Sequence, residues 1–369
     1  MNIITTTKQL NQFIETLKKR ADFIAIDTEF KRQNTYYPQL CLIQIATPFT
    51  EAIIDPLSKD INLDSFFALM KNAKILKVFF AARQDIEAIF NLNNKAIPTP
   101  IFDCQIASML CGYENNLAFQ AIILDLLNIS IDKSMQHTDW TIRPLQDSQI
   151  EYALKDATLL CEIYIILKQK LEKMNRLSWL EEEFNYLTSP STYNTNSDEA
   201  WKKINFFCKT KLDFLILQKL TAWREQQAKK YNLPRLWVLK DAVLLDIIDK
   251  KPEDIFSLKK ILNAKKTKID NNINLQEIIQ IIHKAKNVPY NDIAEIPQLK
   301  FKINQKSPTL IKLQTLLKNI SDKEKIAPSL IATTKTLYKL IDNNENHSIL
   351  KGWRYKIFGK FAENLIKNR

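Results

Sequence analysis

The chain has 369 residues, 46% of them hydrophobic and 25% charged, which is the composition of a globular protein large enough for two or three domains. Its five cysteines and three histidines are not spaced as disulfide frameworks or zinc sites are, so any metal would have to rest on carboxylates. The net charge of +12 is uneven: residues 1–200 contain 19 Lys and Arg against 25 Asp and Glu, whereas residues 201–369 contain 34 against 16, which predicts a polyanionic partner for the second half.

No membrane or export signal stands out in the sequence. No stretch approaches the ~18 consecutive apolar residues of a membrane span. Residues 1–20 have a polar helical pattern in place of a charged end followed by an apolar run. We therefore expect a cytoplasmic protein that has no membrane partner.

The first half predicts an α/β domain. Thr6 and Gln9 are spaced as a capping box, ahead of apolar residues at helical spacing from Leu10 to Leu17. A central sheet is expected from four short apolar runs of strand length. The runs are Phe23–Ile26, Leu40–Ala46, Ala52–Ile54 and Ile75–Phe80. Helical spacing follows in residues 86–90, 101–110, 117–127 and 150–171, so that strands come before most of the helices.

The second half predicts helices. Residues 186–200 are rich in Ser, Thr, Asn and Pro, which is linker composition, and we place the main boundary there. Helical spacing dominates beyond it, and a second break around residues 287–297 indicates two helical modules of similar length. We expect the first domain to have an independent core that folds without residues 209–369.

Acidic residues follow the predicted elements at three places. Asp27 and Glu29 end the run FIAIDTEF, and side chains two apart on a strand share one face. Asp85 follows the strand KVFF where the chain turns into a helix, and Tyr152 and Asp156 are four apart on one helical face. Taken singly, these residues also fit a solvent-exposed strand end, a first-turn helix acid and an exposed polar pair.

Taken together, the four acids suggest a metal site. Carboxylates gathered in one place repel one another unless divalent cations neutralise them, which is the arrangement used for two-metal phosphodiester hydrolysis. We therefore predict a catalytic site of Asp27, Glu29, Asp85, Tyr152 and Asp156, in which the four carboxylates hold two Mg²⁺ or Mn²⁺ ions.

The three acidic segments, the last with the pattern Y-x-x-x-D, resemble the motifs of the DEDD exonuclease superfamily. The segments TYYPQLCLIQIA, FDCQIASMLCGY and HTDWTIRPL are similar to the ribonuclease D family within it. The resemblance implies an α/β ribonuclease H-like exonuclease domain over residues 1–175, with a mixed central sheet flanked by helices. It also implies a metal-dependent 3′–5′ exoribonuclease that releases 5′-mononucleotides. Phe80 and Cys104 depart from the usual His and Thr of the family, but neither replaces a ligand, so we expect altered packing and retained activity.

The same resemblance implies a role for each site residue. Asp27 would bridge both ions, Glu29 and Asp156 would complete the site on the nucleophile's side, and Asp85 would act through the second ion. Tyr152 would orient the attacking water, because a phenol with a pKa near ~10 is a poor base. Trp140 is expected in the core, and Arg143 is expected to tether the last helix of the domain.

Beyond a linker region at 176–208, the segment that begins LDFLILQKLTAWREQQAKKYNLPRLW resembles the HRDC module. The resemblance implies an all-α HRDC domain over residues 209–289 and a second, divergent HRDC-like domain over 290–369. Cations near aromatic residues in the last region suit phosphate contacts with base stacking. The predicted RNA-binding residues are Lys351, Trp353, Arg354 and Lys356, although any one of them also fits a solvated helix face or a core aromatic.

The expected partner is RNA, in particular the 3′ ends of precursor tRNA and other structured RNA, and no obligate protein partner is indicated. Two alternatives stay open at this point. The same superfamily includes DNA-acting exonucleases, and a degenerate nuclease fold would give a non-catalytic RNA-binding adaptor. The intact set of four carboxylates and Tyr152 argues against the adaptor.

Overall fold

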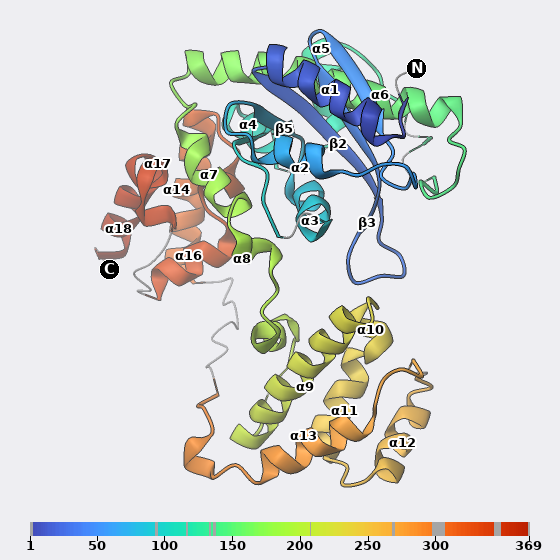
Figure 1. The fold of residues 1–369 in the computed structure, drawn as a ribbon. Helices are drawn as coiled ribbons and strands as arrows, with labels where there is room; N and C mark the ends of the chain where they lie inside the picture. The colour runs from blue at the N-terminus through green and yellow to red at the C-terminus, as the bar shows by residue number, and fades with distance from the viewer. Residues whose placement is uncertain are drawn as a thin grey trace. The chain divides into compact units, whose positions relative to one another are not determined.

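The computed structural model describes residues 3–92, 95–115, 117–132, 134–135, 138–206, 208–267, 270–296, 307–342 and 348–367. The chain forms two compact units (Figure 1). The first unit consists of Met1–Lys31, Leu40–Thr192 and Phe301–Arg369. The second consists of Arg32–Gln39 and Tyr193–Lys300. The predicted boundary at residues 186–200 therefore coincides with a real division, but the end of the chain returns to the first unit.

A six-stranded mixed sheet forms the centre of the first unit, as predicted. The strand order is β1-β4-β3-β2-β5-β6, in which β3 and β4 are antiparallel while β5 is parallel to both of its neighbours. β3 is buried along nearly its whole length because apolar side chains occupy both of its faces. The strands are β1 (Ile3–Ile4), β2 (Phe23–Lys31), β3 (Gln39–Thr47), β4 (Thr50–Ile54), β5 (Leu76–Phe79) and β6 (Ile101–Asp103).

Helices flank this sheet. Thr6 caps the first helix, and its capping box with Gln9 confirms the prediction from sequence. The longest helix, α6, packs its apolar stripe against β2 and β4 and carries Tyr152 and Asp156. These helices are α1 (Thr7–Arg20), α2 (Asp64–Lys71), α3 (Arg83–Leu92), α4 (Cys104–Leu110), α5 (Phe119–Leu127), α6 (Asp147–Lys173), α7 (Trp179–Leu187) and α8 (Pro190–Tyr193).

The helical spacing predicted for residues 101–110 is only partly right. Ile101–Asp103 form strand β6 beside β5, and α4 begins one residue later. Asp103 causes the change, because its carboxylate accepts a hydrogen bond from the backbone N–H of Gln105 at 2.8 Å and so caps the helix.

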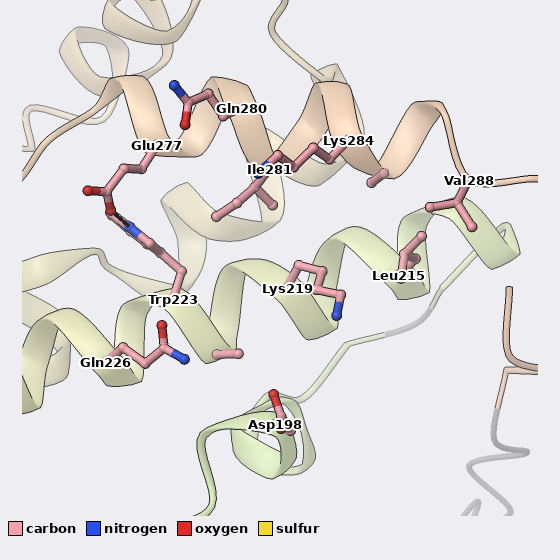
Figure 2. Close-up of a pocket in the computed structure, with 12 residues that line it drawn as sticks. Asp198, Leu215, Lys219, Trp223, Gln226, Glu277, Gln280, Ile281, Lys284 and Val288 are labelled. Atoms are coloured by element: carbon pink, nitrogen blue, oxygen red, sulfur yellow. Dashed lines mark hydrogen bonds between the residues drawn. The ribbon is translucent and has the colours of Figure 1, made fainter.

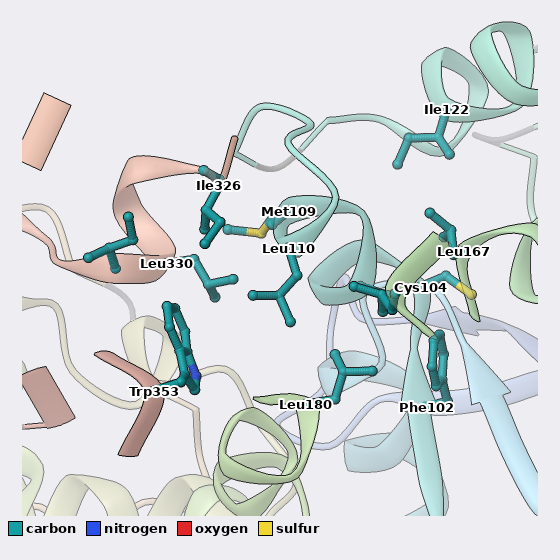
Figure 3. Close-up of a cluster of buried hydrophobic side chains, with 14 of the residues drawn as sticks. Phe102, Cys104, Met109, Leu110, Ile122, Leu167, Leu180, Ile326, Leu330 and Trp353 are labelled. Atoms are coloured by element: carbon teal, nitrogen blue, oxygen red, sulfur yellow. The ribbon is translucent and has the colours of Figure 1, made fainter. Parts of the chain in front are cut away.

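The last part of the chain packs into the same core as the sheet (Figure 3). Ile326, Leu330 and Trp353 join a buried cluster that contains Leu110 and Leu180 from the first half of the chain. Residues 307–367 fold as α14 (Pro308–Glu324), α15 (Pro328–Ile331), α16 (Thr334–Ile341), η3 (Ser348–Leu350), α17 (Gly352–Arg354), η4 (Tyr355–Gly359) and α18 (Lys360–Lys367).

Hydrogen bonds also join the last part of the chain to the first half. The N–H of Ala327 donates to the carbonyl of Met109 at 3.0 Å, and the Arg176 guanidinium donates to the carbonyls of Leu110 at 3.0 Å and Glu324 at 2.7 Å. These contacts, with the burial of Leu180 on α7, correct two expectations. Residues 176–208 are not all linker, and residues 307–367 do not form a domain apart from the nuclease. Deleting residues 209–369 would therefore remove part of the nuclease core. The HRDC-like character of residues 290–369 stays a prediction.

The second unit is built from helices around its own apolar core. Thr210 and Asp213 form a capping box that starts α9, and the buried Arg224 bonds to the Leu239 carbonyl and to Asp241. No helix in the described part of the chain is long and apolar enough to span a membrane. The elements are η1 (Ser197–Lys203), α9 (Lys211–Lys230), α10 (Arg235–Val238), α11 (Asp241–Lys250), α12 (Ile255–Ala264), α13 (Gln276–Lys286) and η2 (Tyr290–Asp292).

The loop that follows β2, Arg32–Gln39, belongs to this second unit. The Tyr36 hydroxyl donates to the buried Glu225, which also pairs with Arg235 at 2.5 Å. Asn232 accepts hydrogen bonds from the backbone N–H groups of Tyr36 and Tyr37. The contact between Tyr36 and Glu225 was not predicted from the sequence, because the two residues lie almost two hundred positions apart.

Candidate active site

Asp27 and Glu29 lie on β2 beyond the point where the strand pairs with β5. The register joins Ala25 to Val78, so the two acids extend past the paired residues toward the carboxyl end of β5. They are two apart on the strand and therefore point to the same face. Both are only partly exposed, while Ile24, Ala25 and Ile26 before them are buried and hold the strand in the core.

Asp85 reaches the site through a strained turn between β5 and α3. Ala81 has a φ of 56°, a left-handed conformation that is uncommon for a residue with a side chain. The carboxylate of Asp103 accepts hydrogen bonds from the N–H groups of Ala81 at 3.1 Å and Ala82 at 2.8 Å. Asp103 thus holds the start of α3, and with it Asp85. This role was not predicted from the sequence, because the partners of Asp103 are backbone groups of another segment.

Thr28 and Tyr152 complete the site's hydrogen bonds. The Thr28 hydroxyl donates to Asp85 Oδ1, so β2 and α3 are joined by a buried contact between two site segments. The Tyr152 hydroxyl is hydrogen-bonded to the Asp156 carboxylate, as the i, i+4 spacing on α6 allows. Because α6 packs against β2, the predicted residues of all three segments are brought together.

Burial raises the pKa of each carboxyl in this group, and repulsion among the acids adds to the rise for Asp27 and Glu29. Burial is the first cause for Asp27, whose pKa lies well above its usual value, and Asp85, Glu29 and Asp156 add repulsion. Burial, then Asp156 and Asp85, raise the pKa of Glu29 to about 8. Burial raises the pKa of Asp85 to about 7 and that of Asp156 to about 6. These four carboxyls can therefore all be ionised at neutral pH only when counter-charges are present.

The chemistry of these side chains fits divalent cations. Asp156 Oδ1 is buried and has no hydrogen-bond partner among the residues that the structure describes. A buried carboxylate oxygen without a partner is costly, and hard cations such as Mg²⁺ prefer oxygen ligands of this kind. Within the described ranges no group of three His, Cys, Asp or Glu side chains is arranged as a ready-made metal site.

Known proteins with the same architecture give the site its context. The family model described as 3′-5′ exonuclease matches residues 1–172, and the HRDC domain model matches residues 213–282. Ribonuclease D of Bartonella henselae is 41% identical over 374 residues, which cover 100% of this chain and 91% of that protein. Ribonuclease D of Jannaschia sp. is 34% identical, covering 98% of this chain and 94% of that protein. The chain belongs to the ribonuclease D family.

A solved structure agrees with this family assignment. The crystal structure of Escherichia coli RNase D, described as an exoribonuclease involved in structured RNA processing, superposes with a TM-score of 0.86 at 25% identity. The alignment covers 100% of this chain and 99% of that one. The family, the 3′–5′ exonuclease domain and the HRDC domain predicted from sequence are thereby confirmed.

The residues expected to be structural lie near the site. Trp140 is buried, as predicted. Arg143 forms a paired contact with Asp55, at 2.6 and 2.8 Å, and donates to the Cys41 carbonyl, so it ties the segment before α6 to the sheet. Asp139 pairs with Lys31, the last residue of β2, at 2.7 Å.

The two residues that depart from the family pattern lie in apolar surroundings. Phe80 packs edge-on against Phe119, with ring centroids 5.0 Å apart, and Cys104 is fully buried in the cluster that contains Phe102. Both positions therefore contribute packing behind the site.

The structure corrects two of the four predicted RNA contacts. Trp353 is buried and stacks on Trp179, with centroids 4.8 Å apart and planes 4° apart. Arg354 pairs with Glu183 at 2.6 Å and donates to the Leu330 carbonyl. Trp353 therefore belongs to the shared apolar core, and the Arg354 guanidinium is engaged by partners within the protein. Lys351 and Lys356 are exposed, and their contact with RNA stays a prediction.

Proposed function

We propose that this ribonuclease D family member is a hydrolase that removes nucleotides one at a time from RNA 3′ ends and releases 5′-mononucleotides. The four carboxylates around β2 would hold two Mg²⁺ or Mn²⁺ ions. The observation that carries the proposal is the group itself: four acids with raised pKa values, one of them with a buried oxygen that lacks a partner among the described residues. Such a group suits cation-assisted cleavage of a phosphodiester.

Each acid has a place in this proposal. Asp27 would be the ligand shared by both ions, Glu29 and Asp156 would complete the site on the nucleophile's side, and Asp85 would serve the second ion. Bound cations would supply a more acidic attacking water and stabilise charge on the leaving 3′ oxygen. Thr28 supports the arrangement because its hydroxyl holds one oxygen of Asp85 and leaves the other available.

Tyr152 would orient the attacking water. Burial, followed by the nearby Asp156, raises the pKa of Tyr152 above its usual value, so the phenol keeps its proton at neutral pH and is no general base. Its hydroxyl is hydrogen-bonded to Asp156 and can donate there. The remaining lone pairs of the oxygen can then accept a hydrogen bond from water and fix its direction.

RNA is the proposed substrate, with the 3′ trailers of precursor tRNA and other structured RNA as the natural class, in the cytoplasm. The similar proteins are ribonucleases D, and the E. coli enzyme is an exoribonuclease involved in structured RNA processing, which supports RNA over DNA. The basic second half supports a polyanion in general.

End-labelled precursor tRNA, digested with Mg²⁺ or Mn²⁺, tests the proposal. We expect products that shorten by single nucleotides from the 3′ end, release of 5′-mononucleotides, and slower cleavage of a DNA strand of matched sequence. Asp27→Asn should lower the rate far more than tenfold while RNA binding persists, because the variant loses the shared ligand but no basic surface. A variant that kept more than about a tenth of the activity, a barrier change of only ~1.4 kcal/mol, would contradict the site.

A further inference from the structure

A pocket with a volume of about 490 Å³ opens on the second unit (Figure 2). Helices α9 and α13 form two of its walls, and Asp198 of η1 contributes from a third side. Its size lies within the range of small-ligand sites, which is roughly 300–1,000 Å³. The apolar lining consists of Leu215, Ala222, Trp223, Ile281, Ala285 and Val288.

One side of the pocket is held rigid. The indole N–H of Trp223 donates to Glu277 Oε2 at 2.5 Å, and Gln227 Nε2 donates to the same oxygen at 2.9 Å. Trp223 is therefore fixed in orientation, and the negative charge of Glu277 is partly balanced by two donors. The result is a preformed apolar wall, which costs little to order when a flat ligand binds.

Two lysines also line the pocket. Lys219 on α9 and Lys284 on α13 line the pocket, are exposed, and form no ion pair among the residues that the structure describes. Other lysines of this unit are paired, such as Lys251 with Asp213 at 2.6 Å and Lys286 with Glu253 at 2.8 Å. Two cations left without a carboxylate beside one apolar pocket suit an anionic ligand with an apolar part.

We propose that this pocket receives one base of a single-stranded RNA segment, while Lys219 and Lys284 contact the phosphates on either side of it. Gln226 and Gln280, which also line the pocket, offer amide groups to the edge of the base. Bases stack favourably on apolar and aromatic surfaces whatever their sequence. The inference rests on the proposed function, since that function supplies RNA as the ligand.

Charge decides for RNA over an apolar peptide. Residues 193–300 contain 20 Lys and Arg against 13 Asp and Glu, so the unit around the pocket is basic. Asp198 and Glu277 are the two carboxylates among the lining residues, and Lys219 and Lys284 are the two cations. A peptide would gain nothing from Lys219 and Lys284 unless it were acidic, whereas every RNA segment carries phosphates on both sides of each base.

The experiment removes bases one at a time. A single-stranded RNA tail is prepared with an abasic nucleotide at successive positions from the 3′ end, and the affinity of each RNA is measured with full-length protein in EDTA. Phosphate contacts do not depend on the base, whereas a base pocket does. We expect one position at which base loss weakens binding by about three- to tenfold, with smaller effects at its neighbours.

Two double variants that lose the same charge test whether the base at that position binds in the pocket. K219Q/K284Q should weaken binding and reduce the dependence on the base, because the phosphates on either side of the base no longer hold it in the pocket. K259Q/K266Q changes two exposed lysines that do not line the pocket, and it should weaken binding only through the lost charge while it keeps the dependence. All four positions are exposed, so thermal unfolding should show both variants folded.

Two outcomes would contradict the pocket proposal. An abasic scan with no sensitive position, or equal effects of the two double variants, would show that RNA is held by general charge alone or that the pocket takes another ligand. Cleavage of a dinucleotide, measured for all proteins, separates this failure from failure of the proposed function. If even the wild type does not cleave the dinucleotide or RNA, the proposed function fails. If cleavage is normal and the scan is flat, only the pocket proposal fails.

Discussion

The position of Tyr152 can be tested by removing one oxygen. Tyr152→Phe keeps the ring beside Trp140, where the centroids are 6.3 Å apart, but removes the hydroxyl that is bonded to Asp156. We expect the rate of the chemical step to fall by about 10- to 100-fold, which corresponds to ~1.4–2.7 kcal/mol in the barrier. Metal affinity should not change, because the hydroxyl is no ligand. Single-turnover cleavage and titration with Mn²⁺ measure the two effects, and loss of Mn²⁺ binding would show that the assigned role is wrong.

Glu29 makes the metal-free protein sensitive to pH. Its pKa in the folded protein is about 8, against a usual value of 4.5, so the folded state holds a proton that the unfolded state has lost. The stability from this proton is full below pH ~4.5 and is lost as pH rises toward 8, by at most about 1.4 kcal/mol per pH unit.

Glu29→Gln should remove this loss of stability with rising pH, because the amide does not titrate. In EDTA, the free energy of unfolding in urea should fall less steeply between pH 5 and 9 than in the wild type. Mg²⁺ should then stabilise the wild type at pH 8 and the variant much less. Glu162→Gln changes an exposed acid on α6 and is the matched control. Parallel pH profiles for wild type and Glu29→Gln would contradict the raised pKa.

At the scale of elements, the turn before α3 depends on Asp103. An amide at this position offers one acceptor oxygen in place of two, while the carboxylate serves the N–H groups of Ala81, Ala82 and Gln105. Asp103→Asn should therefore cost about 1–3 kcal/mol of stability. It should also lower the cleavage rate, because Ala81 holds a left-handed conformation only with this support and Asp85 follows four residues later.

Urea unfolding and kcat on a dinucleotide measure these effects. Asp64→Asn is the control, since Asp64 is an exposed acid in the first turn of another helix, α2. If Asp103→Asn were destabilised but cleaved the dinucleotide at the wild-type rate, Asp103 would support the fold without positioning Asp85.

The elements show what the sequence could predict and why some of it failed. Strands β2 to β5 were found because each is a separate apolar run, and the four carboxylates were found because they follow such runs or share a helix face. β6 was missed because its three residues are too few to show a strand period and lead directly into α4. Asp103 was missed because its partners are the backbone of another segment, which no side-chain pattern reveals.

At the scale of the molecule, periodicity predicts that a helix has an apolar face but not what covers it. The helices of residues 307–367 were predicted correctly as helices, yet their apolar faces complete the nuclease core. Leu110 already had helical spacing of its own, and Leu180 lay in the region expected to be a linker, so neither gave a sign of the surface that the last helices cover. Composition placed the boundary at residues 186–200 because this segment is polar and has few apolar side chains to bury. The division between the two units, between Thr192 and Tyr193, lies within it.

Replacing Trp353 tests whether this residue contacts RNA, as predicted from the sequence, or stabilises the core of the first unit. Its side chain is 2% exposed and stacks on Trp179, so Trp353→Ala should lower the stability of the first unit by about 3–5 kcal/mol. RNA affinity, measured at a temperature where the variant is still folded, should stay at the wild-type level, because a buried indole cannot stack on a base. Trp237→Ala is the control, since Trp237 is 50% exposed in the second unit and should cost little stability.

The two measurements must be made on the same protein, because partial unfolding would also weaken RNA binding and imitate a direct contact. Thermal unfolding followed through the first unit defines the safe temperature, and filter binding is then done below it at two salt concentrations. A contact residue would lower affinity without lowering stability, which is the pattern expected from sequence alone. The buried position predicts the reverse pattern, with stability lost and both the affinity and its salt dependence kept, because no phosphate contact is removed. A stable Trp353→Ala protein with weakened RNA binding would show that the side chain leaves the core to meet RNA.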